Sequence, residues 1–214
     1  MKISNIICDS YPFNHYSFSD VFCENELNDL QQIYSGTEIN WERRGSGQRW
    51  GSTSNVDYTQ KTRGIKILDT NRFFANHENR KTHNVIDRIV SYFSRNDTIA
   101  HFENESGRKI FGNYLRVEFI ADTQATKLKP HRDVSEKIMS MMIYLNTTDE
   151  DPNIGTAIYD SDKILIKTVP YSYNTGFYFY PGENTWHGVE PVTIKTVRKA
   201  IMINYCTFEA EFKL

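Results

Sequence analysis

Residues 175–209 decide the fold; they read TGFYFYPGENTWHGVEPVTIKTVRKAIMINYCTFE. Aromatic and β-branched residues dominate this stretch, and such residues favour the pleated, half-buried surface of a β-sheet. We therefore predict strands near 175–180, 186–192 and 197–209. The Pro-Gly-Glu-Asn sequence between the first two strands indicates a turn.

The same pattern continues upstream to about residue 109. Short runs rich in Ile, Val, Tyr and Phe predict further strands near 110–120, 138–146, 154–160 and 163–169. Turn residues separate these runs, and no helical periodicity lies between them. Strands at this density, without intervening helices, indicate an antiparallel sandwich or a jelly roll.

The N-terminal half differs from this β-rich part. Apolar residues at helical spacing predict one helix between Asp20 and about Tyr34, and a second helix over residues 83–95. Residues 42–64 contain several arginines and glycines among polar residues, and we interpret them as a long basic loop.

No repeat, low-complexity tract or linker divides the chain. We therefore expect a single domain over residues 1–214, in which residues 1–108 provide helical and loop support and residues 109–214 form the β-rich core. The fold class is mainly β with flanking helices (α+β).

Composition excludes several classes of protein. The chain has 214 residues, a formal net charge of −2 and 39% hydrophobic residues, which is the balance of a globular protein rather than a disordered chain or a basic nucleic-acid binder. No run approaches the roughly 20 apolar residues that span a bilayer, and the first eight residues are too short and polar for a secretory signal. Cys8, Cys23 and Cys206 are scattered and odd in number, so we expect neither a disulfide framework nor a zinc site, and a cytoplasmic location.

Two of the six histidines stand apart from the others. His15, His77, His83 and His101 lie in polar or helical surroundings, and we expect each of them at the surface.

His131 and Asp133 are two positions apart in an extended segment, so both side chains project to the same side. His187 begins another β run. Two histidines and one carboxylate are the ligand set of non-haem Fe(II) oxygenases. A turn histidine beside a solvated aspartate is the alternative interpretation of the His-x-Asp triplet.

Arg198 strengthens the metal hypothesis. Alternation along its strand puts Arg198, Ala200 and Met202 on one face, while Lys199 shares the other face with Ile201. An arginine that points into a β-barrel is costly to bury without an anion, and its planar guanidinium suits a carboxylate. A dicarboxylic co-substrate held by the metal at one end and by Arg198 at the other would meet this need.

Taken together, these motifs resemble the 2-oxoglutarate- and Fe(II)-dependent oxygenases, and most closely their prolyl-4-hydroxylase-like branch. The resemblance covers roughly residues 110–208 and rests on His131-x-Asp133, a strand that contains Tyr144, the Trp-His187-Gly-Val-Glu-Pro-Val segment and the strand that opens at Arg198.

The resemblance implies a double-stranded β-helix, which is a cupin-like jelly roll, and an enzyme that hydroxylates a C–H bond with release of succinate and CO2. It implies that His131, Asp133 and His187 bind Fe(II), and that Arg198 and Tyr144 bind the distal carboxylate of 2-oxoglutarate. Dioxygen is the second co-substrate, with ascorbate as a supporting reductant. It implies a peptidyl (prolyl-like) or small-molecule substrate, and from the net charge and the lack of an apolar span we expect neither nucleic acid nor a membrane as partner.

Two departures from the family pattern stand out. Arg198 follows His187 by eleven positions, where some relatives place the basic residue nine or ten positions on; the turn at residues 193–196 can absorb the difference. Relatives also often carry a tyrosine about ten residues before the first metal histidine, facing the co-substrate. We expect Phe119 in that place, without the hydroxyl.

Two further questions stay open at the level of sequence. The basic loop at 42–64 forms either a lid over the site or a solvated loop. The chain itself is either the oxygenase described above or a non-catalytic jelly roll that binds a metal or ligand, which would not consume 2-oxoglutarate.

Overall fold

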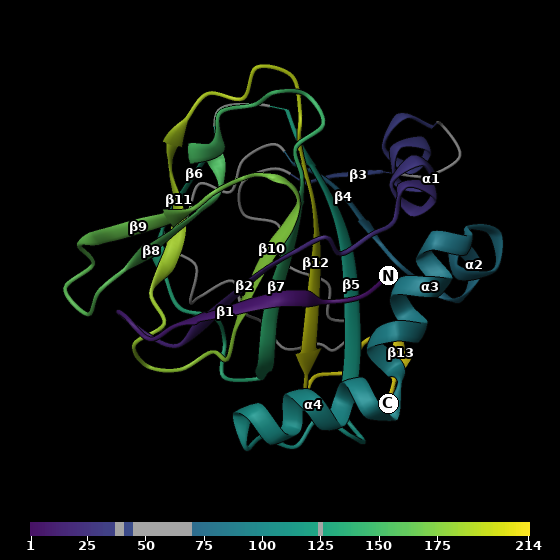
Figure 1. Cartoon of the computed structure of the whole chain (residues 1–214), viewed down its shortest axis with the longest axis horizontal. Coiled ribbons are helices and arrows are strands. Elements are labelled where there is room, and N and C mark those ends of the chain that lie inside the picture. The colour runs from purple at the N-terminus through teal and green to yellow at the C-terminus, as the bar shows by residue number, and fades with distance from the viewer. Residues whose placement is uncertain (37–40, 45–69, 124–125) are drawn as a thin grey trace.

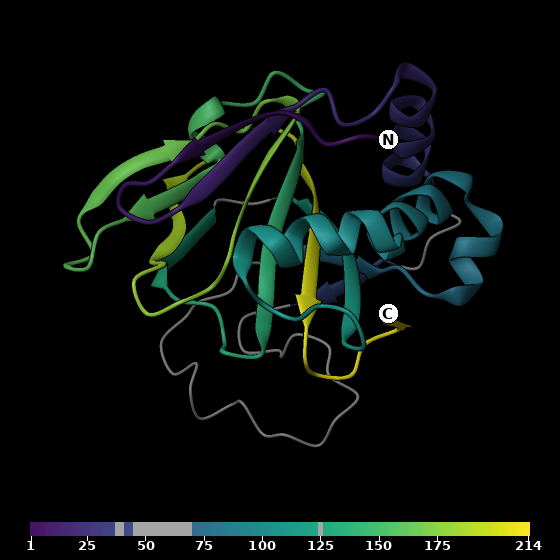
Figure 2. The same ribbon diagram turned by 60° about the horizontal axis from the view of Figure 1, so that its bottom comes forward.

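A computed structural model of the chain describes residues 1–36, 41–44, 70–123 and 126–214 (Figure 1). In these residues, two antiparallel β-sheets pack against each other and helices cover the outer face of the larger sheet (Figure 2). The strand order of the larger sheet is β1-β2-β10-β7-β12-β5-β4-β3, with β13 paired to β5, and that of the smaller sheet is β6-β11-β8-β9. The larger sheet comprises β1 (Ser4–Asp9), β2 (His15–Ser19), β3 (Glu42–Arg44), β4 (Thr70–Phe74), β5 (Tyr114–Asp122), β7 (Lys137–Leu145), β10 (Tyr173–Phe179), β12 (Arg198–Cys206) and β13 (Phe212–Lys213). The smaller sheet comprises β6 (Thr126–His131), β8 (Thr156–Tyr159), β9 (Leu165–Val169) and β11 (His187–Val192).

The strands from β5 to β12 form the predicted double-stranded β-helix. Strands β5, β12, β7 and β10 are neighbours in the larger sheet, and the other four make up the smaller sheet. Each of the seven strands predicted from the sequence has its counterpart in this core. Strand β6 was not predicted; it carries His131 at its end.

The larger sheet has two distinct faces because side chains alternate along each strand. In β12, Ile201, Ile203 and Tyr205 belong to one buried apolar cluster, and Ala200 belongs to the other. The first cluster lies under the helices, and the second fills the space between the two sheets. The predicted alternation is confirmed, and Arg198 is on the inner face, where it is only 3% exposed.

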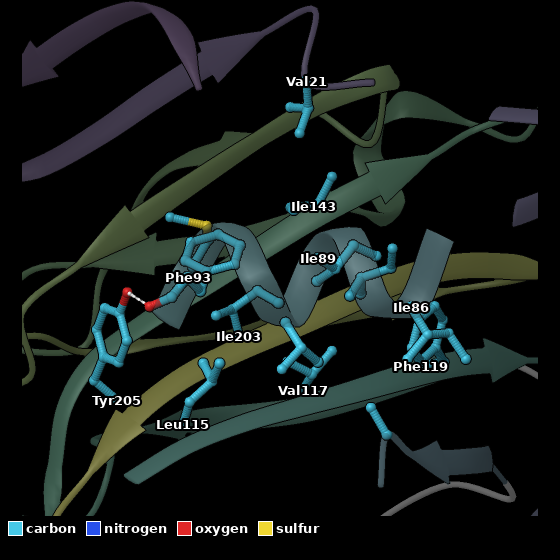
Figure 3. Packing of buried hydrophobic residues seen from close by; sticks show 14 of the residues in the cluster. Val21, Ile86, Ile89, Phe93, Leu115, Val117, Phe119, Ile143, Ile203 and Tyr205 are labelled. Atoms are coloured by element: carbon cyan, nitrogen blue, oxygen red, sulfur yellow. Dashed lines mark hydrogen bonds between the residues drawn. The ribbon is translucent and has the colours of Figure 1, made fainter. Parts of the chain in front are cut away.

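The helix layer consists of α1 (Glu24–Ser35), α2 (His77–Thr82), α3 (Asn84–Ser94) and α4 (Asn96–Ser106). Ile86, Ile89 and Phe93 point from α3 onto β5 and β12, and the Tyr205 hydroxyl donates to the Phe93 carbonyl at 2.7 Å (Figure 3). Full burial of such a side chain contributes about 1.5–3 kcal/mol, so this contact fixes the helix on the sheet.

The two predicted helices correspond to α1 and α3. Helix α1 begins at Glu24, later than expected, because Cys23 forms the N-cap and Glu26 accepts a hydrogen bond from the Cys23 backbone at 3.0 Å. Helices α2 and α4 were not predicted. Helix α4 contributes few apolar residues to the core, chiefly Ile99 and Phe102, which leaves a weak helical signal in its sequence.

The expected basic loop at residues 42–64 is described only at its start. Its first three residues form β3, which pairs with β4, so this part is a strand rather than a loop. Residues 45–64 lie outside the described residues.

The four remaining histidines divide differently from the prediction. His77 and His101 are exposed and His83 is partly exposed, but His15 is 2% exposed and that expectation is wrong. His15 lies on β2 opposite Phe179 of β10 and packs against Phe13, so it belongs to the inner face of the larger sheet. Among the described residues, no helix is both long and apolar enough to cross a membrane.

Candidate metal centre

The structure brings His131, Asp133 and His187 together. His131 ends β6 and His187 opens β11, and the two residues are directly paired across these strands. Their ring centroids are 4.3 Å apart. One potential ligand atom from each of the three residues lies within 4.8 Å of those of the other two. The predicted constellation is therefore confirmed as a spatial cluster.

Backbone contacts orient both imidazoles in the same way. The Nδ1 atom of His131 is 3.0 Å from the carbonyl oxygen of Lys129, and that of His187 is 2.9 Å from the carbonyl oxygen of Thr185. A carbonyl can only accept a hydrogen bond, so each Nδ1 carries the proton and each Nε2 keeps its lone pair. This is the state in which histidine binds a metal through Nε2.

Asp133 is held by two side chains of β7. Lys137 Nζ donates to its Oδ1 at 2.7 Å, and Ser140 Oγ donates to its Oδ2 at 2.5 Å. Burial alone would raise the pKa of Asp133, but the Lys137 ammonium and the two imidazoles outweigh burial and hold this pKa well below its usual range. The carboxylate is thus ionised and fixed in one orientation.

Both histidines are held in the neutral form. Burial and the neighbouring imidazole of His187 lower the pKa of His131 to about 4, and burial lowers the pKa of His187. Two neutral imidazoles and one ionised carboxylate form a nitrogen- and oxygen-rich donor set, which fits Fe(II) with open coordination positions. The donor chemistry of the cluster therefore fits a non-haem iron.

One transverse row of paired residues in the larger sheet supports the cluster. Ser140 of β7, which contacts Asp133, pairs with Asn204 of β12 on one side and with Phe179 of β10 on the other. Asn204 Nδ2 donates to Ser140 Oγ at 3.1 Å, and the Phe179 ring lies 4.8 Å from that of His187. The cluster consequently rests on a polar contact towards β12 and an apolar one towards β10.

Arg198 and Tyr144 meet in the same interior. The Arg198 guanidinium carbon is 5.6 Å from the Tyr144 ring centroid. The Tyr144 hydroxyl is 2.6 Å from Thr156 Oγ1, and burial raises the pKa of this hydroxyl, so it stays protonated. The structure therefore places both residues predicted to bind the co-substrate next to each other.

Arg198 has a partner that the sequence did not indicate. Its Nη1 donates to Asp122 Oδ2 at 3.0 Å, and its Nε donates to the carbonyl of Ile154 at 2.7 Å. Asp122 is directly opposite Arg198 in the β5–β12 pair. A guanidinium has five N–H donors, so these two contacts leave donors for a second carboxylate.

The turn before Arg198 is also held by a residue that sequence reasoning missed. The buried Glu150 carboxylate accepts backbone hydrogen bonds from Lys195 at 2.9 Å and from Thr196 at 2.6 Å. Burial would raise its pKa, but these donors lower it. Glu150 thus fixes the longer turn that was expected to absorb the eleven-residue spacing.

Phe119 does not lie at the co-substrate position, contrary to expectation. It is fully buried in the cluster beneath the helices, against Tyr34 and Phe73 (Figure 3). Its neighbour Ile120 faces the interior instead. The reason is strand parity, because one position along β5 moves a side chain to the opposite face.

Three aromatic residues from β10 and from the segment between β10 and β11 lie on different sides of the larger sheet. Tyr178 and Tyr180 donate to Glu105 of α4 and so face the helices. Trp186 lies next to His187, and Arg132 and Lys163 are 4.9 and 4.6 Å from its ring centroid. Of these three aromatic residues, Trp186 is the one beside the cluster.

Residues 115–206 match the family model of the 2OG-Fe(II) oxygenase superfamily. The match covers 92 of the 214 residues and confirms the resemblance to that superfamily that the motifs of the sequence predicted. The matched region runs from β5 to β12 and contains the cluster, Arg198 and Tyr144. The protein is accordingly a 2-oxoglutarate-dependent, non-haem Fe(II) dioxygenase, with Fe(II), 2-oxoglutarate and O2 as the cofactor and co-substrates of its family.

Solved structures share the fold at low sequence identity. A prolyl-4-hydroxylase from Pseudomonas putida is 10% identical with a TM-score of 0.57, and the match covers 90% of this chain and 91% of that chain. A 2OG-Fe(II) oxygenase family oxidoreductase from Burkholderia pseudomallei is 10% identical with a TM-score of 0.55, covering 90% and 84%. A prolyl hydroxylase from Trichoplax adhaerens, in complex with a peptide fragment of the hypoxia inducible factor oxygen degradation domain, is 13% identical with a TM-score of 0.55, covering 90% and 83%. None of the curated proteins matches the chain.

Proposed function

We propose that this dioxygenase hydroxylates a C–H bond of a peptidyl (prolyl-like) or small-molecule substrate, with release of succinate and CO2. His131, Asp133 and His187 hold Fe(II), while Arg198 and Tyr144 hold the distal carboxylate of 2-oxoglutarate. The observation that carries the proposal is the meeting of two Nε2 lone pairs and one ionised carboxylate in an interior that also contains a buried arginine.

Bound Fe(II) would supply the activation of O2, coupled to the oxidative decarboxylation of 2-oxoglutarate. The side chains of the protein orient the reactants and exclude water. Lys137 and Ser140 fix the Asp133 carboxylate, and Asp122 with the Ile154 carbonyl fixes Arg198. A site held in this way loses little free energy to reorganisation when its ligands bind.

The carboxylate at position 133 favours hydroxylation over halogenation. Halogenating relatives leave that coordination position to a halide, whereas Asp133 occupies it here. The substrate assignment is supported by the fold shared with the prolyl-4-hydroxylase from Pseudomonas putida and with the peptide-bound enzyme from Trichoplax adhaerens. The unpaired state of Cys8, Cys23 and Cys206 fits a cytoplasmic location.

Release of succinate tests the proposal. With Fe(II), 2-oxoglutarate and O2, the wild-type protein is expected to form succinate in proportion to substrate, and the Asp133→Ala variant to form none. Asp29→Ala, an acidic residue on α1 away from the cluster, serves as the control and should retain activity. Full activity in folded Asp133→Ala would sink the assignment, and a metal-loaded wild type that never consumes 2-oxoglutarate would favour a non-catalytic binding protein.

A further inference from the structure

A second polar group lies on the inner face of the larger sheet, beside the metal centre and on its β5 side. We call Arg72, Arg116 and Glu118 the Glu118 patch. Arg116 and Glu118 alternate along β5 with Val117, which packs under the helices, so both of them face inward (Figure 3). Arg72 of β4 pairs with Ile120, another inner-face residue, and this places it on the same side.

Glu118 is buried without the hydrogen bonds that a carboxylate requires. Its side chain is 0% exposed, and neither carboxylate oxygen accepts a hydrogen bond from the described residues. The nearest charges are Arg72 Nη1, 3.3 Å from Oε1, and Arg116 Nη2, 4.0 Å from Oε2. Buried carboxylate oxygens are normally hydrogen-bonded, because an unsatisfied one carries the full cost of desolvation.

Neighbouring residues fix the orientation of Arg116, but they do not use all of its hydrogen-bond donors. Its Nη2 donates to Asn204 Oδ1 at 2.7 Å, while its Nε has no partner among the described residues. The rings of Phe74 and Phe208 lie 6.0 and 5.4 Å from the guanidinium carbon and hold its plane. A hydrogen-bond donor and two acceptor oxygens are therefore available together in a buried place.

The Glu118 patch is connected to the metal centre through short contacts. Arg116 contacts Asn204, Asn204 contacts Ser140, and Ser140 contacts Asp133. A molecule bound at the patch would consequently lie beside the iron ligands. Asp122 pairs with Arg198 and lies 4.0 Å from Arg72, so Arg72 links the patch to the predicted co-substrate site.

We infer that the Glu118 patch binds a free α-amino acid, with the ammonium on Glu118 and the carboxylate on Arg116, and that this amino acid is the substrate. The inference rests on the proposed function. The patch offers the Glu118 carboxylate and the Nε donor of Arg116, so it has a partner for each charge of a zwitterion. A peptide backbone carries neither charge, so it would give neither Glu118 nor Arg116 a charged partner.

Thermal unfolding of the loaded protein tests the inference. The protein is loaded with Fe(II) and 2-oxoglutarate under anaerobic conditions, and its melting temperature is measured with each standard L-amino acid and with the matching N-acetyl amino-acid amide. At least one free amino acid is expected to raise the melting temperature by binding the native state, and its capped form is not.

Variants test whether the amino acid binds at the Glu118 patch. In Glu118→Gln, the affinity for that amino acid should fall by about tenfold to a hundredfold, because a charged hydrogen bond is lost. Glu26→Gln is the matched control, since Glu26 is also buried but pairs with the N-terminal amine on the helix side; it should bind the amino acid as the wild type does. Arg116→Gln provides a second test if Glu118→Gln does not fold.

Each other result overturns the inference. Wild-type protein that binds no free amino acid, capped compounds that bind as well as free ones, or unchanged affinity in Glu118→Gln would each do so. A capped compound that binds alone would indicate a peptidyl substrate. The visible charge-transfer band of the Fe(II)–2-oxoglutarate complex separates the two hypotheses: with the band present only this inference fails, and with the band absent the proposed function fails.

Discussion

The two faces of strands β5 and β12 are built from the same backbone but have opposite chemistry. On the face beneath the helices, the residues are apolar and fully buried, as with Val117, Ile201 and Ile203. On the inner face, the neighbouring positions carry charged groups, such as Glu118 and Arg198, which are buried to almost the same extent. The residues of the two faces are therefore buried to a similar extent, but burying the charged groups costs more free energy than burying the apolar ones.

This difference separates the residues that stabilise the fold from the residues that form the site. Apolar burial contributes about 25 cal/mol per Å2 to stability, so the outer face accounts for a large part of the folding free energy. Buried charges contribute little net stability even when they are paired. We conclude that the inner-face charges are retained for binding, and adjacent residues on one strand provide direct tests of this conclusion.

The largest effect on stability is expected from the outer face. Ile203→Ala should lower the free energy of unfolding by about 2–5 kcal/mol, because it removes a fully buried side chain from beneath α3. Met202→Ala, one position away and only partly buried on the inner face, should cost less and should alter turnover instead. Urea unfolding together with succinate release measures both effects. Equal losses of stability in the two variants would contradict the division between the faces.

The next effect concerns the affinity for 2-oxoglutarate. Arg198→Lys replaces a planar, multiply bonded guanidinium by a point charge, so the Kd for 2-oxoglutarate should rise by about tenfold to a hundredfold. Lys199→Gln changes the adjacent residue on the opposite face and should leave the Kd unchanged. Titration of the anaerobic Fe(II) protein measures both values. An unchanged Kd in Arg198→Lys would remove Arg198 from the co-substrate site.

A smaller effect is expected from the contact that orients Asp133. Ser140→Ala removes the hydroxyl that donates to Oδ2, and iron affinity should fall by about tenfold, as for other residues that orient a metal ligand. Ser106→Ala removes a hydroxyl at the end of α4 that bonds to the backbone of Phe102 and of Arg108, and it is the control. Competition with a metal chelator measures the affinity. A Kd for iron that is equal in both variants would show that Ser140 does not position Asp133.

The last effect is confined to the metal-free protein and concerns the dependence of its stability on pH. The pKa of His131 falls from 6.5 to about 4 on folding, because burial and His187 disfavour its charged form. Between these values the unfolded state binds more protons, so stability is fully present above pH 6.5 and is lost as the pH falls towards 4. Melting temperatures measured across this range in the presence of a chelator should fall less in His131→Gln than in the wild type. The exposed His101→Gln should follow the wild type, and an identical decline in all three proteins would contradict the assignment.

Much of the fold could be predicted because its signals are local. Short runs rich in Ile, Val, Tyr and Phe, separated by turn residues, predicted the seven core strands, and an apolar stripe predicted α3. The missed elements lack such signals. Strand β6 reads Thr-Lys-Leu-Lys-Pro-His and forms a strand because β11 pairs with it, which is a tertiary effect.

Site residues could be predicted from the sequence where their spacing along the chain determines their relative positions. His131 and Asp133 are close together in the sequence. Alternation within the strand that opens at Arg198 determines which face of the sheet the Arg198 side chain occupies. Phe119 and Asp122 depend on the register of β5 against β12, and a shift of one residue exchanges the faces. The burial of His15 likewise depends on the pairing of β2 with β10, two segments far apart in the sequence.

The most direct test of the central claim is the anaerobic addition of Fe(II) and then 2-oxoglutarate to the purified protein, followed by its visible spectrum. The inner-face site predicts a metal-to-ligand charge-transfer band in the wild type that is absent in Asp133→Ala and needs more 2-oxoglutarate in Arg198→Lys. A folded, iron-loaded wild type without the band, or a band of equal strength in Asp133→Ala, would contradict the claim.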